Sequence, residues 1–240
     1  MKKLLLMVLF LILLTGCENN NDKLIMVTEA GFAPYEYYDN NNIVGVDIDI
    51  AQEIASYLGK ELVIKDLAFD SLIEELNSGK ADFAAAGMSI TEERDEKVDF
   101  SSEYVENSQI VVVRKGYDEI KTVDDLKNKK ISAQMGSIAD LYVSKYYTDA
   151  TLITQKKFLT AAQDVISGKT DCLIMDHLPA QQLVNKQNEK LEILNIVVMY
   201  DKYAIAVKNG NEELLSAINI VLDRLKREGK IKEFLLKHSL

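Results

Sequence analysis

Apolar residues recur along the chain with two alternating spacings, one typical of strands and one typical of helices. Short apolar runs predict strands at residues 24–28, 62–64, 83–86, 109–114, 131–134, 152–154, 172–175 and 203–207. Apolar positions three and four residues apart predict helices at residues 51–58, 70–77, 138–146, 159–166, 179–188 and 212–228. Because strands and helices alternate, we predict an α/β protein whose sheets are mostly parallel and flanked by helices.

Residues 69–82 and residues 158–171 carry the same pattern. Each begins with Phe, continues with a helical segment, reaches a Ser-Gly-Lys-x-Asp turn and leads into an apolar strand. Such turns recur by chance in α/β proteins; the alternative is that the chain holds two similar lobes. Ligands of open α/β sheets bind beyond the carboxyl ends of the strands. With two lobes, the ends of the matching strands at Gly87 and Asp176 would face one shared cleft.

The first residues of the chain indicate an export signal. Lysines at positions 2 and 3 precede the apolar run from Leu4 to Leu14, which is shorter than the roughly 20 residues of a membrane span. The sequence Leu-Thr-Gly-Cys that ends at Cys17 resembles the cleavage site of bacterial lipoproteins. A plain signal peptide that ends near a cysteine is the alternative. We predict a lipoprotein signal peptide at residues 1–16, lipidation of Cys17 and a tether at residues 17–22.

Composition and charge exclude several classes of protein. The 240 residues include 38 acidic and 28 Lys or Arg side chains, which gives a net charge of −10. An acidic chain without a basic stripe is a poor nucleic-acid binder, because phosphates need clustered Lys and Arg. Two cysteines and two histidines are too few for a disulfide scaffold or a typical zinc site. We expect no nucleic-acid partner, no metal and no cofactor, and the length suits two lobes of roughly 100 residues each.

The two strand ends carry groups of complementary charge. At the first, Gly87 lets a ligand approach the backbone, Ser89 offers a hydroxyl group and Arg94 offers a guanidinium fork that fits a carboxylate. At the second, Asp176 can accept an ammonium group. Taken singly, Arg94 could pair with a neighbouring Glu, and Asp176 could cap the helix that contains Pro179. Together they match the two charged ends of a free α-amino acid.

Four segments then resemble a known family in their order: residues 28–36 (TEAGFAPYE), 45–49 (GVDID), 86–94 (AGMSITEER) and 98–101 (VDFS). Across nearly all of residues 23–240 the chain is similar to the periplasmic-type amino-acid-binding proteins of ABC importers, in the polar amino-acid branch called solute-binding family 3. The resemblance implies the two-lobed, type II periplasmic-binding-protein fold, with a two-strand hinge that lets the lobes close on a ligand.

This fold implies how the chain is divided. We expect lobe 1 at residues 23–106 and 201–240 and lobe 2 at residues 107–200. The crossing strands would then lie near residues 103–108 and 199–203.

The resemblance implies roles for residues that bind the ends of the amino acid. Arg94 should clamp the α-carboxylate, helped by backbone amides near residues 136–138. Asp176, Ser89 and the carbonyl group of Gly87 should take the α-ammonium group. Ile138 is a departure, since Thr or Gly is common at this position in the family, and it removes a hydroxyl group but keeps the amide.

Other residues match positions that contact the ligand side chain. Phe32 and Phe69 should flank it, although ordinary core packing is the alternative for both. Glu29 stands where the family usually has Asp, which leaves its contact with side-chain donors open. Gln134 matches a position that varies with specificity. The full set of expected contacts is Glu29, Phe32, Phe69, Ala86, Gly87, Ser89, Arg94, Gln134, Ser137, Ile138 and Asp176.

The implied function is reversible binding rather than catalysis. The protein would be an exported, lipid-anchored monomer that captures a free polar L-amino acid and delivers it to a permease coupled to an ATPase subunit. A basic ligand and a glutamine-like ligand both remain open. The main alternative is an exported enzyme similar to cyclohexadienyl dehydratase on the same fold, with Glu29 as its acid. A receptor sensor is the third interpretation, and it would need a membrane span and a signalling domain.

Overall fold

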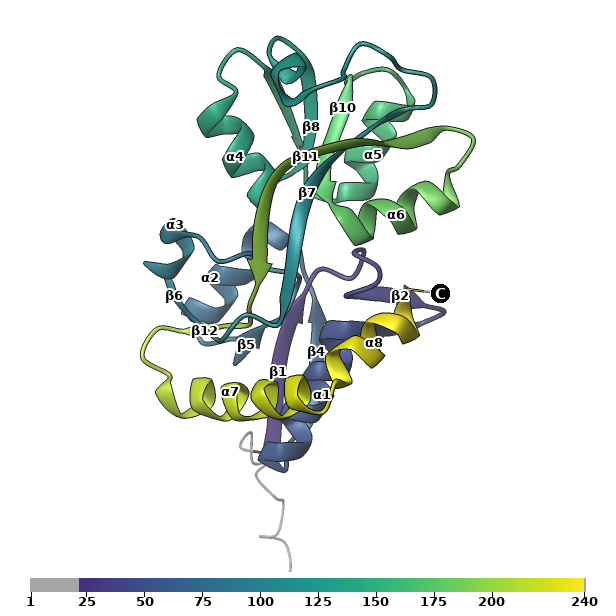
Figure 1. Ribbon diagram of the computed structural model, residues 1–240. Coiled ribbons are helices and arrows are strands. Elements are labelled where there is room, and N and C mark those ends of the chain that lie inside the picture. The colour runs from purple at the N-terminus through teal and green to yellow at the C-terminus, as the bar shows by residue number, and fades with distance from the viewer. Residues whose placement is uncertain (1–21, 240) are drawn as a thin grey trace, which may run out of the picture.

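The computed structural model describes residues 22–239, which form two five-stranded sheets and a two-stranded hairpin. The predicted signal peptide, Cys17 and the tether up to residue 21 lie outside the described residues. Figure 1 shows each five-stranded sheet in its own half of the molecule, surrounded by its own helices. We call these halves the first lobe and the second lobe.

The first lobe contains a mixed sheet. Across the sheet the strands are β4 (Glu61–Asp66), β1 (Lys23–Thr28), β5 (Phe83–Ala84), β12 (Ala206–Lys208) and β6 (Val98–Phe100). β1 is parallel to both of its neighbours, and β12 is antiparallel to both of its neighbours. The other elements of this lobe are the hairpin strands β2 (Tyr37–Asp39) and β3 (Asn42–Val44), the 3₁₀ turn η2 (Phe69–Ser71), and the helices α1 (Val46–Leu58), α2 (Leu72–Asn77), α3 (Glu92–Asp95), α7 (Glu212–Arg227) and α8 (Lys230–His238).

The second lobe is also mixed. Its strands are, in order, β11 (Leu191–Tyr203), β7 (Val105–Arg114), β10 (Cys172–Asp176), β8 (Lys130–Gln134) and β9 (Thr151–Gln155). β8 is parallel to β9 and β10, whereas β7 is antiparallel to β10 and β11. The sequence predicted mostly parallel sheets, but each sheet is half antiparallel, because β12 and β7 each run against both of their neighbours. The remaining elements are the 3₁₀ turn η3 (Val123–Leu126) and the helices α4 (Ile138–Tyr146), α5 (Phe158–Ile166) and α6 (His177–Lys186).

β7 and β11 form the connection between the lobes. They pair in antiparallel register from Val105 opposite Tyr203 to Arg114 opposite Leu191, with irregularities between Leu194 and Met199. Figure 1 shows this long pair running from the first lobe up into the second. The chain therefore leaves the first lobe along β7 and returns along β11.

The end of the chain differs from the pattern prediction in two places. Residues 203–207 were expected to form one strand, but Tyr203 ends β11 opposite Val105, while Ala206 begins a separate strand opposite Ala84. The chain changes sheets within this apolar run. Gly229, at φ +71°, then separates α7 from α8, a helix that the sequence pattern did not predict.

The two Ser-Gly-Lys-x-Asp turns occupy equivalent places in the two lobes. Asp82 accepts a hydrogen bond from the Ile25 amide at 2.6 Å, at the beginning of β1. Asp171 accepts one from the Lys130 amide at 2.7 Å, at the beginning of β8. In both lobes the turn thus ties the end of a helix to the start of the neighbouring strand, which supports the interpretation of two similar lobes.

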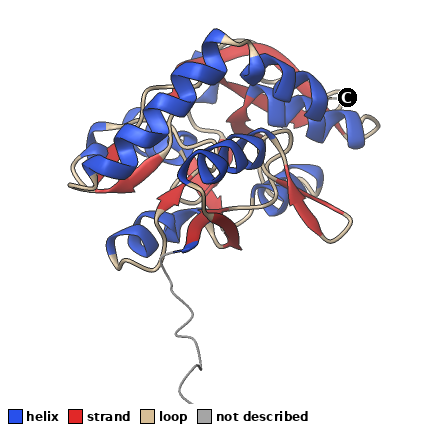
Figure 2. Ribbon diagram, turned by 90° about the horizontal axis from the view of Figure 1, so that it is seen from below, coloured by secondary structure: helices blue, strands red, loops and turns tan. Residues whose placement is uncertain are grey.

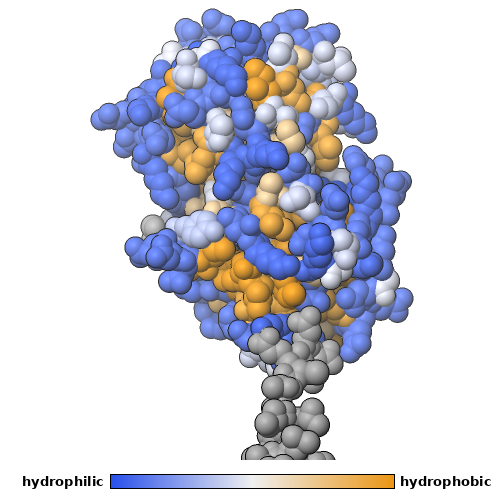
Figure 3. All heavy atoms as spheres, turned by 180° about the vertical axis from the view of Figure 1, so that it is seen from behind, coloured by the Kyte–Doolittle hydropathy of each residue, from blue (hydrophilic) through white to orange (hydrophobic). Residues whose placement is uncertain are grey.

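The apolar core continues from one lobe to the other. Its largest cluster includes Met26 and Val221 in the first lobe and Val165 in the second. Phe32 and Phe158 join the two parts, with ring centroids 5.6 Å apart in an edge-to-face arrangement. Figure 2 shows helices lying against strands when the molecule is seen from below, and Figure 3 shows hydrophilic residues over much of one face. Within residues 22–239, no helix has the length and apolar character to cross a membrane.

Candidate binding site

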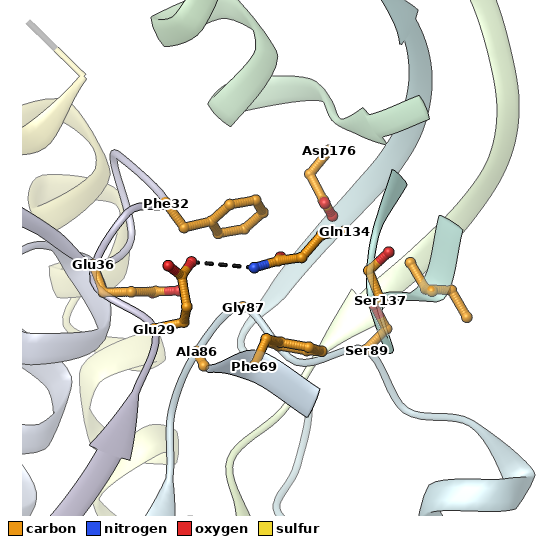
Figure 4. A pocket seen from close by; sticks show the side chains of 11 residues that line it. Glu29, Phe32, Glu36, Phe69, Ala86, Gly87, Ser89, Gln134, Ser137 and Asp176 are labelled. Atoms are coloured by element: carbon orange, nitrogen blue, oxygen red, sulfur yellow. Dashed lines mark hydrogen bonds between the residues drawn. The ribbon is translucent and has the colours of Figure 1, made fainter. Parts of the chain in front are cut away.

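A small cavity lies between the two lobes and encloses about 300 Å³ of empty space. Figure 4 shows its lining side chains converging from both lobes. The lining residues are Glu29, Phe32, Glu36, Phe69, Ala86, Gly87, Ser89, Gln134, Ser137, Ile138 and Asp176. Ten of these were expected from the sequence; Glu36 was not, and Arg94 is the expected residue that does not line the cavity.

The carboxyl ends of four strands meet at this cavity. Glu29 directly follows β1, and residues 86 and 87 lie two and three residues beyond β5. Gln134 and Asp176 are the last residues of β8 and β10 in the second lobe. Because parallel strands direct their carboxyl ends to the same edge of a sheet, both sheets present these side chains to one space. Each lobe thus contributes the residues at the carboxyl ends of two neighbouring parallel strands, and these residues form the site.

Gly87 is required by the close packing around it. Its φ of +53° falls in the left-handed region, where residues with a Cβ atom are disfavoured. A Cβ atom at this position would lie 2.8 Å from the ring of Phe32. Its amide donates to Asp47 at 2.9 Å, which fixes the loop after β5 against α1. The aromatic ring and the backbone of the cavity wall are thus in direct contact.

Asp176 is held by a set of hydrogen-bond donors. Its Oδ1 atom accepts from Asn107 at 2.5 Å, from Gln109 at 2.6 Å and from the Tyr203 hydroxyl group at 2.5 Å. Burial, followed by the nearby charge of Asp201, raises the pKa of Asp176. The result is a buried carboxyl group with a fixed orientation at the hinge-side wall.

Asp201 is a second acidic group at this end that sequence reasoning missed. It accepts from the Ser89 hydroxyl group at 2.5 Å and from Asn107 at 2.9 Å. Burial raises its pKa, and hydrogen bonds from Ser89 and Asn107 oppose this effect. Ser89 therefore faces an acidic pair rather than Asp176 alone. No local motif marked Asp201, because it lies inside the long strand β11 and reaches the site only through the hinge pairing.

Arg94 lies beside the cavity and bridges the lobes. Its guanidinium group donates to the carbonyl of Ser89 at 2.5 Å and to the carbonyl of Gly136 in the second lobe at 2.8 Å. It also packs over the Phe69 ring, 5.4 Å from the ring centroid. Burial lowers the pKa of Arg94 to about 10, so the group keeps its charge at neutral pH. This cation is adjacent to Ser89 and Phe69, two residues of the cavity wall.

The loop at residues 136–138 departs from the expected arrangement. The amide of Gly136 donates to Asp140 at 2.8 Å, and the amide of Ser137 donates to the carbonyl of Gln134 at 3.1 Å. The Ser137 side chain caps α4 by accepting from the Asp140 amide at 3.2 Å. Two of the amides expected to help hold a carboxylate are thus used within their own loop.

Two glutamates line the opposite end of the cavity. Glu29 accepts from Gln134 at 3.3 Å, a contact that crosses from the second lobe and is drawn as a dashed line in Figure 4. Burial raises the pKa of Glu29, while the Gln134 hydrogen bond and the charge of Lys157 oppose this effect. Burial and the neighbouring Asp47 hold the pKa of Glu36 well above its usual value. Glu29, Glu36 and Asp176 give the cavity three acidic side chains, and no Lys or Arg from residues 22–239 lines it.

The acidic groups are not arranged as a metal centre. Among the described residues, no set of three or more His, Cys, Asp or Glu side chains is placed to hold a metal ion. Cys172 is buried in β10, and burial raises the pKa of its thiol group to about 12. The side chains that line the cavity offer charged groups and hydrogen-bond donors and acceptors.

Comparison with known proteins gives a consistent result. Residues 24–239 match the family described as bacterial extracellular solute-binding proteins, family 3. The ABC transporter arginine-binding protein 1 of Escherichia coli is 32% identical over 95% of this chain and 95% of its own length. The glutamine-binding protein GlnH of Bacillus subtilis is 31% identical over 91% of this chain and 81% of its own length.

The fold of the chain is also similar to that of a solved structure. The amino acid ABC transporter substrate-binding protein AbpA of Streptococcus pneumoniae, bound to L-arginine, has a TM-score of 0.86 and 31% identity, with coverage of 90% of this chain and 94% of that one. The type II periplasmic-binding-protein fold expected from the sequence is confirmed by this match. The chain belongs to family 3 of the bacterial extracellular solute-binding proteins.

Proposed function

We propose that the protein is the extracytoplasmic amino-acid-binding component of an ABC importer, and that it binds a free L-amino acid with a cationic side chain. The observation that carries the proposal is the interlobe cavity, which three buried acidic side chains line without a Lys or Arg among the described residues. A cation is the partner that such a cavity favours, because an unpaired buried carboxylate is costly.

The hinge-side end of the cavity would bind the α-ammonium group. Asp176 and Ser89 line the cavity there, and Asp201 lies directly behind Ser89. An ammonium group has three donors, and this end supplies carboxylate and hydroxyl oxygens that accept them. Burial raises the pKa values of both aspartates, and a bound ammonium group would stabilise their ionised forms.

Arg94 would bind the α-carboxylate. Its guanidinium group has five N–H donors, and two of them are used on the carbonyl groups of Ser89 and Gly136. A carboxylate that enters between Ser89 and Ser137 would replace a carbonyl group with a charged acceptor, which makes the stronger hydrogen bond. The direct hydrogen bond from Arg94 to the Gly136 carbonyl group would then be replaced by an ion pair between Arg94 and the ligand, which in turn contacts the second lobe.

The side-chain end favours a basic amino acid over a neutral one. Glu29 supplies a carboxylate, and Phe32 and Phe69 supply aromatic rings in the same cavity, an arrangement that suits a guanidinium or ammonium group. Proteins similar to this chain include binders of arginine and of glutamine, so both kinds of ligand occur on this fold. The acidic lining supports the arginine-like ligand.

Binding would close the lobes and prepare delivery. Ligand that contacts both lobes stabilises the closed form by its differential affinity for the two forms. The closed monomer would dock on a permease and release the amino acid for import that an ATPase subunit drives. We take residues 23–106 and 201–240 as one lobe and residues 107–200 as the other, and we propose reversible binding without a chemical step.

Lipidation at Cys17 would keep the protein at the outer face of the membrane. The family of extracellular solute-binding proteins is exported, and the apolar run before Cys17 supports a lipoprotein signal. Metabolic labelling with a radioactive fatty acid would test the anchor. Label in the wild-type protein but not in Cys17→Ser would support it, and equal label in both would contradict it.

Calorimetric titration tests the binding function. The fragment from residue 18 onward should be unfolded, dialysed to remove bound ligand, refolded and titrated with each free amino acid. We expect saturable binding of arginine, lysine or ornithine, with much weaker binding of acidic and apolar amino acids. Binding of a neutral amino acid alone would contradict the basic preference, and no binding across the panel would contradict the proposed function as a whole.

A further inference from the structure

Glu36 is a buried glutamate that the contacts proposed above do not use. Its side chain is 1% exposed and lines the cavity. Figure 4 shows that it extends towards the carboxyl group of Glu29. Its Oε2 atom and the Oε1 atom of Glu29 are buried, and neither has a hydrogen-bond partner within the described part of the chain. Both oxygens belong to side chains of the same cavity wall.

The backbone directs Glu36 inward. The amide of Phe32 donates to the carbonyl of Glu36 at 2.7 Å, and the amide of Glu36 donates back to Phe32 at 3.3 Å. These two bonds close the loop between β1 and β2, so the side chain of Glu36 projects from a fixed backbone. Its position next to Glu29 is therefore a consequence of the loop and does not depend on the conformation of a flexible side chain alone.

The groups that face Glu36 are acidic or phenolic. From α1, Asp47 lies within hydrogen-bonding reach of the Glu36 carboxyl group. Two carboxylates this close cannot both be ionised without a large cost, so one of them keeps a proton. The titratable groups that surround them come from the loops after β1 and before β7 and from α1, β10 and β11. They are Glu29, Tyr35, Asp47, Tyr104, Asp176, Asp201 and Tyr203.

Glu36 is the member of this group that is best placed to hold the proton. Asp47 already accepts from the Gly87 amide at 2.9 Å and from the Tyr104 hydroxyl group at 2.7 Å, and both bonds favour its ionised form. Burial still raises the pKa of Asp47 to about 6, and burial and the neighbouring Asp47 hold the pKa of Glu36 well above its usual value. Burial also raises the pKa of Glu29, but the bond from Gln134 favours its ionised form.

We propose that Glu36 is a second acidic contact for the cationic side chain of the ligand, and that it gives up a proton when that cation binds. The inference rests on the proposed function. In the step, the O–H bond of the Glu36 carboxyl group breaks, the proton passes to the buffer, and the resulting carboxylate pairs with the guanidinium or ammonium group. A neutral side chain brings no charge to stabilise that carboxylate, so it releases no proton from Glu36.

The sign of the pH dependence follows from linkage. A bound cation lowers the pKa of Glu36 relative to the free protein, so binding releases a proton at any pH between the two values. Affinity for the cationic ligand therefore rises with pH across that window, by up to tenfold per pH unit for one proton. Above the pKa that Glu36 has in the free protein, affinity no longer rises with pH, because Glu36 is already ionised before the ligand binds.

Calorimetry in buffers of different ionisation enthalpy measures the released protons directly. We would titrate the protein with L-arginine and with L-citrulline, its neutral analogue, in phosphate and in Tris at about pH 7.5, where both buffers hold the pH. Both ligands carry an α-ammonium group, so both should release the same number of protons from Asp176 and Asp201. The difference in the number of protons released therefore comes from the end of the cavity that binds the ligand side chain. Wild type should release up to one proton more with arginine.

Variants identify the source of the proton. In Glu36→Gln the excess release with arginine should disappear, whereas it should persist in Glu61→Gln, an exposed control at the start of β4. Equal release with arginine and citrulline in wild type, or an excess that survives in Glu36→Gln, would overturn the inference while arginine binding itself still stood. If Glu36→Gln does not fold, Glu29→Gln decides: the excess release should persist in that variant, and its loss there would assign the proton to Glu29 and overturn the inference. Failure of wild type to bind arginine would overturn both this inference and the basic preference.

Discussion

Replacement of Arg94 by Met gives the sharpest test of how the site holds an amino acid. Methionine keeps an unbranched apolar side chain against Phe69 and removes only the guanidinium group. Arg94 is 5% exposed, so an ion pair with a ligand carboxylate would be shielded from solvent and weakly screened by salt. Loss of one partner from a buried, hydrogen-bonded charge pair costs about 2–5 kcal/mol of binding. The dissociation constant should therefore rise by roughly 30- to 4,000-fold.

The stability of the variant must be separated from its affinity. Arg94 also donates to the carbonyl groups of Ser89 and Gly136, which lose their donor in Arg94→Met. Unfolding in denaturant without ligand measures that loss, and calorimetric titration of the folded variant measures affinity. Lys97→Met is a matched control, because Lys97 has a side chain 51% exposed and pairs with Glu93 at the surface. It should change affinity by less than about fivefold. Affinity of Arg94→Met within threefold of wild type would refute the role of Arg94.

Three further predictions test other parts of the structure. Glu29→Gln should weaken arginine binding by about 1.5–3 kcal/mol and glutamine binding far less, because it removes a charged acceptor; equal losses by calorimetry would contradict this. In Gly136→Ala a Cβ atom would lie 3.2 Å from Asp70 in the other lobe at φ +75°. The left-handed cost of about 1–2 kcal/mol falls on the open and closed forms alike and should lower the free energy of unfolding. The contact with Asp70 crosses the lobes, so it weakens the closed form and should accelerate stopped-flow dissociation of ligand, and an unchanged dissociation rate would count against the contact. Asp82→Asn and Asp171→Asn should each lower the free energy of unfolding by about 1–2 kcal/mol without changing affinity, and an effect in one lobe only would argue against equivalent turns.

Patterns within single elements were enough to predict much of the fold. The helix expected at residues 138–146 is confirmed, and the structure shows Ser137 as its cap. The helix at residues 212–228 is confirmed to within one residue, with Asn211 as its cap and basic residues in its last turn. Both segments combine an apolar stripe with capping residues, so their local signals agree with their tertiary environment.

The features that the pattern missed depend on contacts between distant segments. The split of residues 203–207 has no local marker, because Tyr203 and Ala206 are both fully buried and differ only in which sheet they join. Asp201 was missed because it reaches the site only through the pairing of β11 with β7, which no local pattern marks. Glu36 follows Pro34 and Tyr35 in what reads as a turn, where a glutamate is ordinarily solvated. Its burial results from packing against α1.

The distribution of charge around the cavity bears on the choice of ligand. Five carboxyl groups (those of Glu29, Glu36, Asp47, Asp176 and Asp201) lie within or directly behind its wall, and Arg94 is the guanidinium group beside them. A neutral amino acid adds one ammonium and one carboxylate group, so it leaves the net charge of the site unchanged. A basic amino acid adds one positive charge at the end where Glu29 and Glu36 lie. Because burial makes each unpaired carboxylate costly, the same acidic cluster that destabilises the empty site should favour the basic ligand over its neutral analogue.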